Sequence, residues 1–327
     1  MVYDERVEEL TGLVARRFEI LNLAGKGGMG EVYRVRDWQT NGVVALKVIA
    51  ADAEHQLERF SRESELLEAL EHPGIVKYVG HGTVDDGRPF LAMEWLEGES
   101  LAEHLDRQLL TIGEALAMAE GVAEALGAAH AHGIVHRDLK PGNVFLVGGQ
   151  VERIKLLDFG IASARGSTKE LTESTTMLGT PGYMAPEQMQ SSKDASAAAD
   201  VFSLGCVLFK SLTGTIPFEG KNTMDLVLSV MTQPPLPILA LRQDATRPIA
   251  TLLEKLLAKD VDDRPRDGGE AAELVRQVRA ERDAETHESY RPPTAPEVNV
   301  QALPTRIVTR SGGYGMNGEG NKSGSGD

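Results

Sequence analysis

The pattern of apolar and polar residues is strand-like from 18 to 49, with a period-2 alternation in EVYRVR and a short apolar run in VVALKVIA, and it is strand-like again at 75–80 and 89–95. This alternation predicts β-strands that bury one face. The runs are broken by segments typical of turns, namely GKGGMG, WQTNG and DDG. The first part of the chain is therefore predicted to be mainly β-sheet.

The apolar pattern changes to that of a helix in residues 55–70, where leucine and phenylalanine recur at spacings of 3, 7 and 3. Residues 144–160 predict a β-hairpin around a GGQ turn. The other apolar helices are predicted after Gly98, at residues 101–110, 112–133, 199–214 and 249–260. A strand-rich part followed by a helix-rich part predicts a two-lobed α+β fold.

The two ends of the chain differ from its middle. Residues 1–15 are predicted to be a polar lead, and the folded domain is predicted to span residues 16–285. Residues 286–327 are rich in proline, glycine and serine and hold few large apolar side chains. Such a segment cannot offset its ordering entropy, so a disordered tail is predicted.

Composition limits the classes of function. Hydrophobic residues make up 41% of the 327, enough to form a core, and 34 basic against 49 acidic residues give a net charge of −15. This acidic balance argues against nucleic acid and anionic membranes as partners. We expect a cytoplasmic protein, because no apolar run could span a bilayer and the acidic N-terminus lacks a signal-peptide layout. A single cysteine, Cys206, excludes an internal disulfide.

Three glycines, Gly25, Gly27 and Gly30, form a G-x-G-x-x-G pattern. The alternating residues that follow place the pattern between two strands rather than at the start of a helix. Such a loop can approach phosphates closely, because no side chain intervenes. An ordinary glycine-rich turn is the alternative.

Lys47 shares one face of its predicted strand with Val43, Ala45 and Ile49. A lysine in this setting needs a partner or a ligand. Glu63 falls on the apolar face of the predicted helix and is the candidate partner. The alternatives are a lysine that reaches solvent and a glutamate tolerated at the edge of the stripe.

Charged and amide side chains gather in the segment VHRDLKPGNVFL, which brings Asp138, Lys140 and Asn143 into one turn. Asp158 follows at the end of a predicted buried strand. Phosphoryl transfer needs these groups to accept a hydroxyl proton, stabilise phosphate and hold a divalent metal. Either segment alone could be a polar turn, but the two in this order match the signature of kinases.

The chain resembles bacterial eukaryotic-like (Hanks-type) serine/threonine protein kinases over residues 16–285. The motifs that carry the resemblance follow the family's order: GKGGMGEV, VALK, Glu63, HRDLKPGN, DFG, GTPGYMAPE, Asp200 and DDRP. The resemblance implies a β-rich N-lobe at residues 16–93, a hinge at 94–97 and a mainly helical C-lobe at 98–285.

The resemblance also implies roles for single residues. Asp138 would accept the hydroxyl proton, Lys140 would steady the γ-phosphate, and Lys47 would pair with Glu63 and contact the phosphates of ATP. Asn143 and Asp158 would hold Mg²⁺, with Mn²⁺ as the alternative ion. The implied nucleotide-binding residues are those of the glycine-rich loop, the two walls of the adenine site and the hinge: Gly25, Lys26, Gly27, Gly28, Gly30, Val32, Ala45, Lys47, Met93, Glu94, Leu96 and Phe145.

The implied substrates are proteins with serine or threonine acceptors, because Lys140 and Thr180 match the serine/threonine type. Structural roles are implied for a Glu187–Arg264 pair and for Asp200, which would anchor the catalytic loop. His136 and Cys206 are expected to be packing residues, and the histidines to form no metal site.

The segment from 161 to 187 is rich in hydroxyl groups, and Arg137 precedes the catalytic Asp138, as in kinases that phosphorylation activates. We expect autophosphorylation there, with Thr172 and Ser174 favoured, and self-association if one copy modifies another. Ser163 stands where relatives often have a basic residue, so the dependence on phosphate is expected to be partial. A pseudokinase scaffold and a small-molecule phosphotransferase are the alternative functions.

Overall fold

The computed structural model describes residues 10–27, 30–49, 68, 70–159, 181–190 and 196–289. Met1–Thr286 form one compact unit, and all of the sheets and helices below lie in it except the end of the last helix. The helix predicted at 55–70 falls almost wholly outside the described residues.

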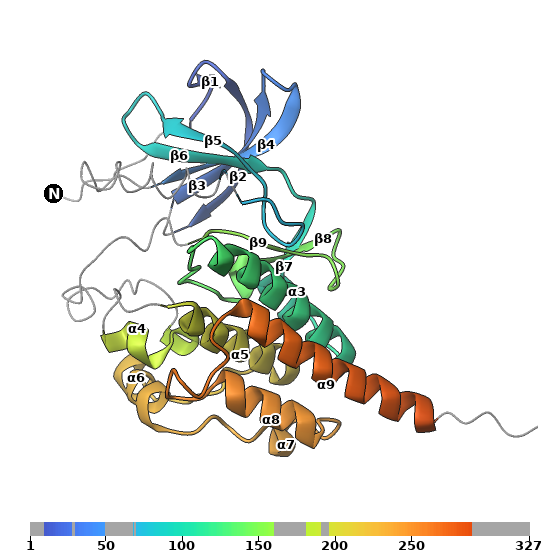
Figure 1. Ribbon diagram of the computed structural model, residues 1–327. Coiled ribbons are helices and arrows are strands. Elements are labelled where there is room, and N and C mark those ends of the chain that lie inside the picture. The colour runs from blue at the N-terminus through green and yellow to red at the C-terminus, as the bar shows by residue number, and fades with distance from the viewer. Residues whose placement is uncertain are drawn as a thin grey trace, which may run out of the picture. The chain divides into compact units, whose positions relative to one another are not determined.

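The N-terminal part is a six-stranded antiparallel sheet with the strand order β1-β2-β3-β4-β6-β5 (Figure 1). Its strands are β1 (Leu13–Val14), β2 (Phe18–Gly27), β3 (Gly30–Asp37), β4 (Gly42–Ile49), β5 (Tyr78–Thr83) and β6 (Pro89–Glu94). The alternating runs therefore predicted the strands. The polar lead was placed too far along the chain, because β1 lies within it and Val14 is buried against the sheet.

The two faces of this sheet have different partners. Tyr33 and Val35 of β3 point to one face and are fully buried among the aromatic and aliphatic residues of the N-terminal core. Val32 points to the other face and packs with Ala45 and Met93. Successive side chains of a strand alternate between faces, so the sequence pattern also determines which residues can face a ligand.

A second, three-stranded sheet joins the N-terminal sheet to the helices. It consists of β7 (Gly98–Ser100), β8 (Val144–Val147) and β9 (Ile154–Leu156), and the β8–β9 pairing confirms the predicted hairpin. The helical part comprises α2 (Leu101–Leu105), α3 (Ile112–Ala131), α4 (Pro186–Gln190), α5 (Ala197–Thr213), α6 (Thr223–Thr232), α7 (Ile238–Leu241), α8 (Arg247–Leu256) and α9 (Gly268–Ser289), with short 3₁₀ turns at Pro141–Asn143 and Pro181–Tyr183.

Helix α5 is the centre of the C-terminal core. Nearly every residue from Ala198 to Leu212 is buried, and the helix packs against α3 and α8 (Figure 1). A helix that is apolar all round is expected in the interior of a domain. It ends at Gly214, whose φ of 79° is the left-handed conformation of a helix C-cap.

Helix boundaries are set by signals that the apolar pattern misses. Both α2 and α3 begin with a capping box, formed by Ser100 with Glu103 and by Thr111 with Glu114. The second box starts a new helix, so α2 ends at Leu105 and not near residue 110 as predicted. Helix α9 continues to Ser289, past the end predicted for the domain at residue 285.

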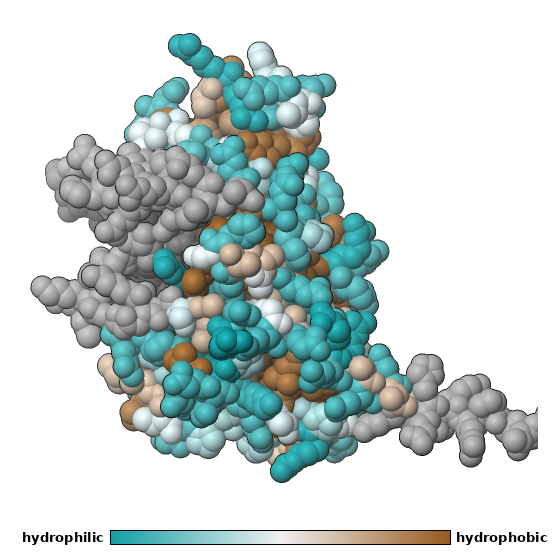
Figure 2. Space-filling model, viewed as in Figure 1, coloured by the Kyte–Doolittle hydropathy of each residue, from teal (hydrophilic) through white to brown (hydrophobic). Residues whose placement is uncertain are grey.

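The described surface is mostly hydrophilic on the face shown in Figure 2, with apolar side chains in small groups. Among the residues that the structure describes, no helix combines the length and apolarity needed to cross a membrane.

We expect Asp37→Asn to destabilise the N-terminal sheet. Asp37 is fully buried and forms two hydrogen bonds of 2.8 Å with the Arg17 guanidinium. This hydrogen bonding holds the pKa of Asp37 at about 2, below its usual 3.8. The carboxylate therefore contributes roughly 2 kcal/mol to the free energy of unfolding above about pH 4, and the contribution declines as the pH falls toward 2.

The measurement is denaturant unfolding of the wild type and the variant across this pH range. The difference between the two proteins should stay constant from neutral pH to about pH 5 and shrink below pH 4. A difference of the same size at pH 3 and pH 7 would contradict the role given to the charge.

Candidate active site

The turn before β8 brings the predicted catalytic residues into direct contact. Lys140 Nζ lies 2.7 Å from Asp138 Oδ2. The amide nitrogen of Asn143 donates to the Asp138 backbone oxygen at 2.7 Å and to its Oδ2 at 3.1 Å. The side chains of Asp138 and Lys140 are 20% and 24% exposed, so the carboxylate is oriented yet open to a substrate.

Asp200 of α5 anchors this turn, which we call the catalytic turn because it carries the predicted catalytic residues. Its carboxylate, 1% exposed, accepts hydrogen bonds from the backbone nitrogens of His136 and Arg137 at 2.7 and 2.8 Å. Arg137 has a φ of 66°, which is strained for a residue with a side chain. The anchoring predicted for Asp200 is thus confirmed, and it holds a strained backbone directly before Asp138.

His130 also contacts Asp200, a role that the sequence did not reveal. Its Nδ1 accepts from the backbone N–H of Gly268 at 3.0 Å, so the proton of the neutral ring resides on Nε2. Nε2 lies 2.9 Å from Asp200 Oδ2 and donates to it. His130 therefore joins the start of α9 to the anchor of the catalytic turn. Among the residues that the structure describes, no group of three or more His, Cys, Asp or Glu side chains is placed to hold a metal ion.

Asp158, after β9, completes the site from another segment. Its Oδ2 lies 2.6 Å from Nζ of Lys47 in β4, and its φ of 55° is again in the left-handed region. His136 contacts the carbonyl oxygen of Leu157 at 2.9 Å, and its ring lies 4.7 Å from that of Phe159. This packing role of His136 confirms the prediction and links the catalytic turn to the residues around Asp158.

The partner predicted for Lys47 was Glu63, which lies outside the described residues, as do Gly28 and Thr180. The Lys47–Glu63 pair and the hydroxyl-rich segment therefore stay predictions. What the structure adds is that the strand lysine and the predicted metal ligand Asp158 come within contact distance.

The glycine-rich segment forms the hairpin between β2 and β3. Gly30 has a φ of 135°, and a Cβ there would lie 2.0 Å from the backbone oxygen of Val48. Only glycine fits this position. Gly25 and Gly27 pair with Val32 and Gly30 across the hairpin. The sequence expectation of a strand–turn–strand is confirmed.

Lys26 pairs with Glu31 across the hairpin, on the face opposite to Val32 and Lys47. Its Nζ lies 2.8 Å from the carboxylate of Glu31. In this structure the Lys26 side chain is held away from the predicted nucleotide face, so a contact with nucleotide would involve its backbone.

The predicted adenine-facing residues come from separate strands. Ala45 and Met93 are direct partners across β4 and β6, and Val32 packs with them. Phe145 lies in β8, below the N-terminal sheet, and Leu96 follows β6 in the connection to β7 (Figure 1).

The carboxylate of Glu94 forms structural hydrogen bonds. Its Oε1 accepts from the backbone nitrogen of Lys77 at 2.7 Å and from Lys155 Nζ at 2.5 Å. Lys155 also donates to the backbone oxygen of Ile75. The side chain therefore ties the hinge to β9. The backbone nitrogen of Glu94 is also engaged, because it donates to the backbone oxygen of Lys77 at 2.8 Å, so the role predicted for Glu94 at the nucleotide stays a prediction.

The residues predicted to hold Mg²⁺ fit a divalent cation. The amide nitrogen of Asn143 is used by Asp138, which leaves the amide oxygen for a cation. Asp158 supplies a carboxylate that is about one-quarter exposed. Hard oxygen donors of this kind suit Mg²⁺, which usually keeps several other positions for water and phosphate.

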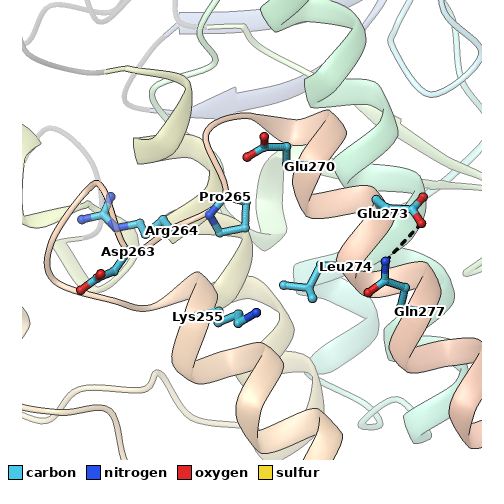
Figure 3. A pocket seen from close by; sticks show the side chains of 8 residues that line it. All are labelled: Lys255, Asp263, Arg264, Pro265, Glu270, Glu273, Leu274 and Gln277. Atoms are coloured by element: carbon cyan, nitrogen blue, oxygen red, sulfur yellow. Dashed lines mark hydrogen bonds between the residues drawn. The ribbon is translucent and has the colours of Figure 1, made fainter.

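Two further predictions are confirmed away from the catalytic turn. Arg264 donates to both oxygens of Glu187 at 2.7 and 2.9 Å with its side chain fully buried, and Cys206 is a buried free thiol. Arg264 also borders a groove of about 350 Å³ between α8 and α9 (Figure 3). None of the predicted catalytic or nucleotide-binding residues lines this groove.

Comparison with known proteins agrees with this geometry. Residues 18–278 match the model of the protein kinase domain family. The chain therefore belongs to this family, as the order of its motifs predicted.

Its relatives include bacterial enzymes. The chain is 35% identical over 317 residues to serine/threonine-protein kinase pkn2 of Myxococcus xanthus. The aligned region covers 94% of this chain and 37% of the relative. The chain spans about half or less of the length of the curated relatives it matches first.

Solved structures with the same fold include the kinase domain of PknI from Mycobacterium tuberculosis. That match has a TM-score of 0.66 and 29% identity, and covers 83% of this chain and 99% of the PknI chain. Rad53 in complex with AMP-PNP shares the fold at 24% identity, with a TM-score of 0.66 over 79% of this chain and 65% of the Rad53 chain.

We expect Asp200→Asn to disrupt the catalytic turn more than its size suggests. The variant has one oxygen in place of two to accept hydrogen bonds from His130, His136 and Arg137. Its amide NH₂ group also faces N–H groups, with which it cannot form a hydrogen bond. We expect the free energy of unfolding to fall by about 2–4 kcal/mol, because buried donors lose a charged acceptor. Denaturant unfolding measures this loss.

Ser211→Ala is the matched control, since Ser211 is also buried on α5 but its hydroxyl donates only to Val207 of the same helix. We expect it to be nearly neutral. If the two variants were equally stable, the anchoring role of Asp200 would be wrong.

Proposed function

We propose that the chain is an ATP-dependent serine/threonine protein kinase. The observation that carries the proposal is the convergence of Asp138, Lys140 and Asn143 in one contact network, with Lys47 and Asp158 paired beside it. The intact set argues against a pseudokinase scaffold. The relatives named as serine/threonine kinases support the substrate class.

Each side chain has a chemical task in this proposal. Asp138 accepts the proton of the acceptor hydroxyl while that oxygen bonds to the γ-phosphorus and the bond to the leaving ADP oxygen breaks. Lys140, held 2.7 Å from Asp138, stabilises negative charge on the transferred group. Lys47 binds the remaining phosphates. Mg²⁺, held by Asn143 and Asp158, supplies charge neutralisation when bound.

The acceptors are serine and threonine hydroxyls of proteins. The AMP-PNP complex of Rad53, which has the same fold, supports ATP as the phosphate donor. Because ATP is an intracellular substrate, we place the chain in the cytoplasm. The hydroxyl-rich segment at 161–187 suits a kinase that modifies itself before it modifies others.

The central test is Asp138→Asn. Loss of a general base lowers the rate about 10²–10⁴-fold, and the variant should still fold and bind ATP. Transfer of labelled phosphate to a basic protein measures the rate, and small alcohols and aminoglycosides in the same assay test the alternative of a small-molecule phosphotransferase.

Asp106→Asn, an exposed aspartate at the end of α2, is the control and should retain full activity. Lys47→Met should also remove activity without unfolding the protein. If purified Asp138→Asn had the turnover of the wild type, the catalytic role assigned to Asp138 would be wrong.

We further propose that phosphorylation at Thr172 or Ser174 raises activity. A phosphate brings about −1.5 to −2 charge and could pair with Arg137, which precedes Asp138. Mass spectrometry after treatment with ATP should find phosphate between Thr172 and Thr176.

Alanine at Thr172, Ser174, Thr175 and Thr176 should then lower activity only in part, because Ser163 stands where relatives often have a basic residue that would bind the phosphate. An initial rate that rises with the square of protein concentration would support transfer between two copies. An unmodified segment, or an alanine variant as active as the treated parent, would remove this regulation from the proposal.

A further inference from the structure

Glu31 is a buried carboxylate that the proposed reaction does not use. It lies directly after Gly30 at the start of β3, and its residue surface is 4% exposed. A carboxylate is almost never buried without partners, because loss of hydration disfavours its charge. Its partners therefore indicate what it is held there to do.

Those partners come from three places in the N-terminal sheet. Glu31 Oε1 lies 2.8 Å from Nζ of Lys26 in β2. Oε2 accepts the hydroxyl of Tyr33 at 2.7 Å and lies 3.5 Å from Arg88, in the turn between β5 and β6. Burial alone would raise the pKa of Glu31, but the hydrogen bonds from Lys26 and Tyr33 outweigh it and the pKa is lowered. The group is therefore charged at neutral pH.

Two of the three partners are fixed independently of Lys26. Tyr33 is fully buried, and its hydroxyl also accepts the backbone N–H of Leu10 at 3.2 Å. The Arg88 side chain is 11% exposed and is oriented by Asp86, whose carboxylate lies 2.8 Å from its Nε. Glu31 is thus pre-organised, and only its contact with Lys26 reaches a largely exposed group, with 58% of that side chain accessible.

The Lys26–Glu31 pair is placed at the end of the hairpin ladder. The two residues are cross-strand partners, and the next pair is Gly27 with Gly30. A pair of two exposed side chains contributes little, because both must be ordered. Here the carboxylate is already fixed, so the pair restrains the glycine-bearing end of β2 where side-chain packing cannot do so.

We propose that Glu31 is a positioning residue that holds the glycine-rich hairpin in place over the phosphates of ATP, acting through Lys26. The proposal rests on the proposed function, because it assigns the phosphates to this hairpin. It predicts that Glu31 affects binding of the phosphates and has no effect on binding of the adenosine part.

Asp37 provides a matched control in the same strand. It is the other buried carboxylate of β3, at the far end, and it is paired with Arg17. Asp37→Asn should lower stability as Glu31→Gln does, but it should leave nucleotide affinity unchanged, since it lies away from the hairpin. Any general loosening of the sheet affects both variants.

The experiment measures dissociation constants by calorimetry for ATP with Mg²⁺ and for adenosine. Glu31→Gln should weaken ATP about tenfold, the effect of losing one hydrogen bond to a charged group, and leave adenosine unchanged. Tyr33→Phe, which removes only the hydroxyl beside Glu31, should give a smaller loss of the same kind. Lys26→Met should match Glu31→Gln, and the double variant should be no weaker than either.

Three results would overturn the proposal. Equal losses for ATP and adenosine would mean that Glu31 only stabilises the sheet. Unchanged ATP affinity in Glu31→Gln and Tyr33→Phe would remove any role at the nucleotide. Tighter ATP binding in Glu31→Gln would mean that the ion pair withholds Lys26 from the phosphates.

A separate assay distinguishes failure of the inference from failure of the proposed function. If the wild type binds ATP but transfers no phosphate to protein, the function is wrong while the affinity comparison still tests Glu31. If the wild type is an active kinase and the affinities of its variants do not change, only the inference is wrong. If Glu31→Gln fails to fold, Lys26→Met and Tyr33→Phe still decide the question. In each of these variants the buried carboxylate of Glu31 keeps two of its three partners.

Discussion

The catalytic turn depends on one buried charge, the carboxylate of Asp200. Its oxygens accept hydrogen bonds from the backbone N–H groups of His136 and Arg137 and from the ring Nε2 of His130, at distances of 2.7 to 2.9 Å. The positive φ of Arg137 is unfavourable, and it persists because these hydrogen bonds form in an interior where water cannot replace them. Asp138 is therefore held in position by a helix far away in the sequence.

Buried carboxylates also hold the N-terminal sheet in place. Its two buried carboxylates, Asp37 and Glu31, lie at opposite ends of β3, and each is paired with basic side chains. Asp37 secures the end that joins β4, whereas Glu31 secures the hairpin next to the ligand-facing residues. Apolar packing fixes the middle of the strand, and hydrogen bonds between charged groups fix its two ends.

Charged groups make two of the contacts between the lobes at the site. Lys47 of the N-terminal sheet contacts Asp158, and Lys155 of β9 contacts Glu94 at the end of β6. Such contacts can be made and broken with less loss than an apolar core, since each charged group can also be solvated or bind a ligand. This arrangement suits a site that must admit a nucleotide between the lobes.

The sequence by itself determined the strands, the chief helices, the hairpin of glycines and the residues of the catalytic turn, because alternation, turn residues and motif order are local signals. It offered no sign that Glu31 is buried or which residues are its partners. Only the tertiary structure decided that Lys26 faces away from Lys47, that His130 supports Asp200 and that Lys155 holds Glu94. These contacts join residues far apart in the chain, and the choice among many possible charged partners is made by packing, which no local pattern records.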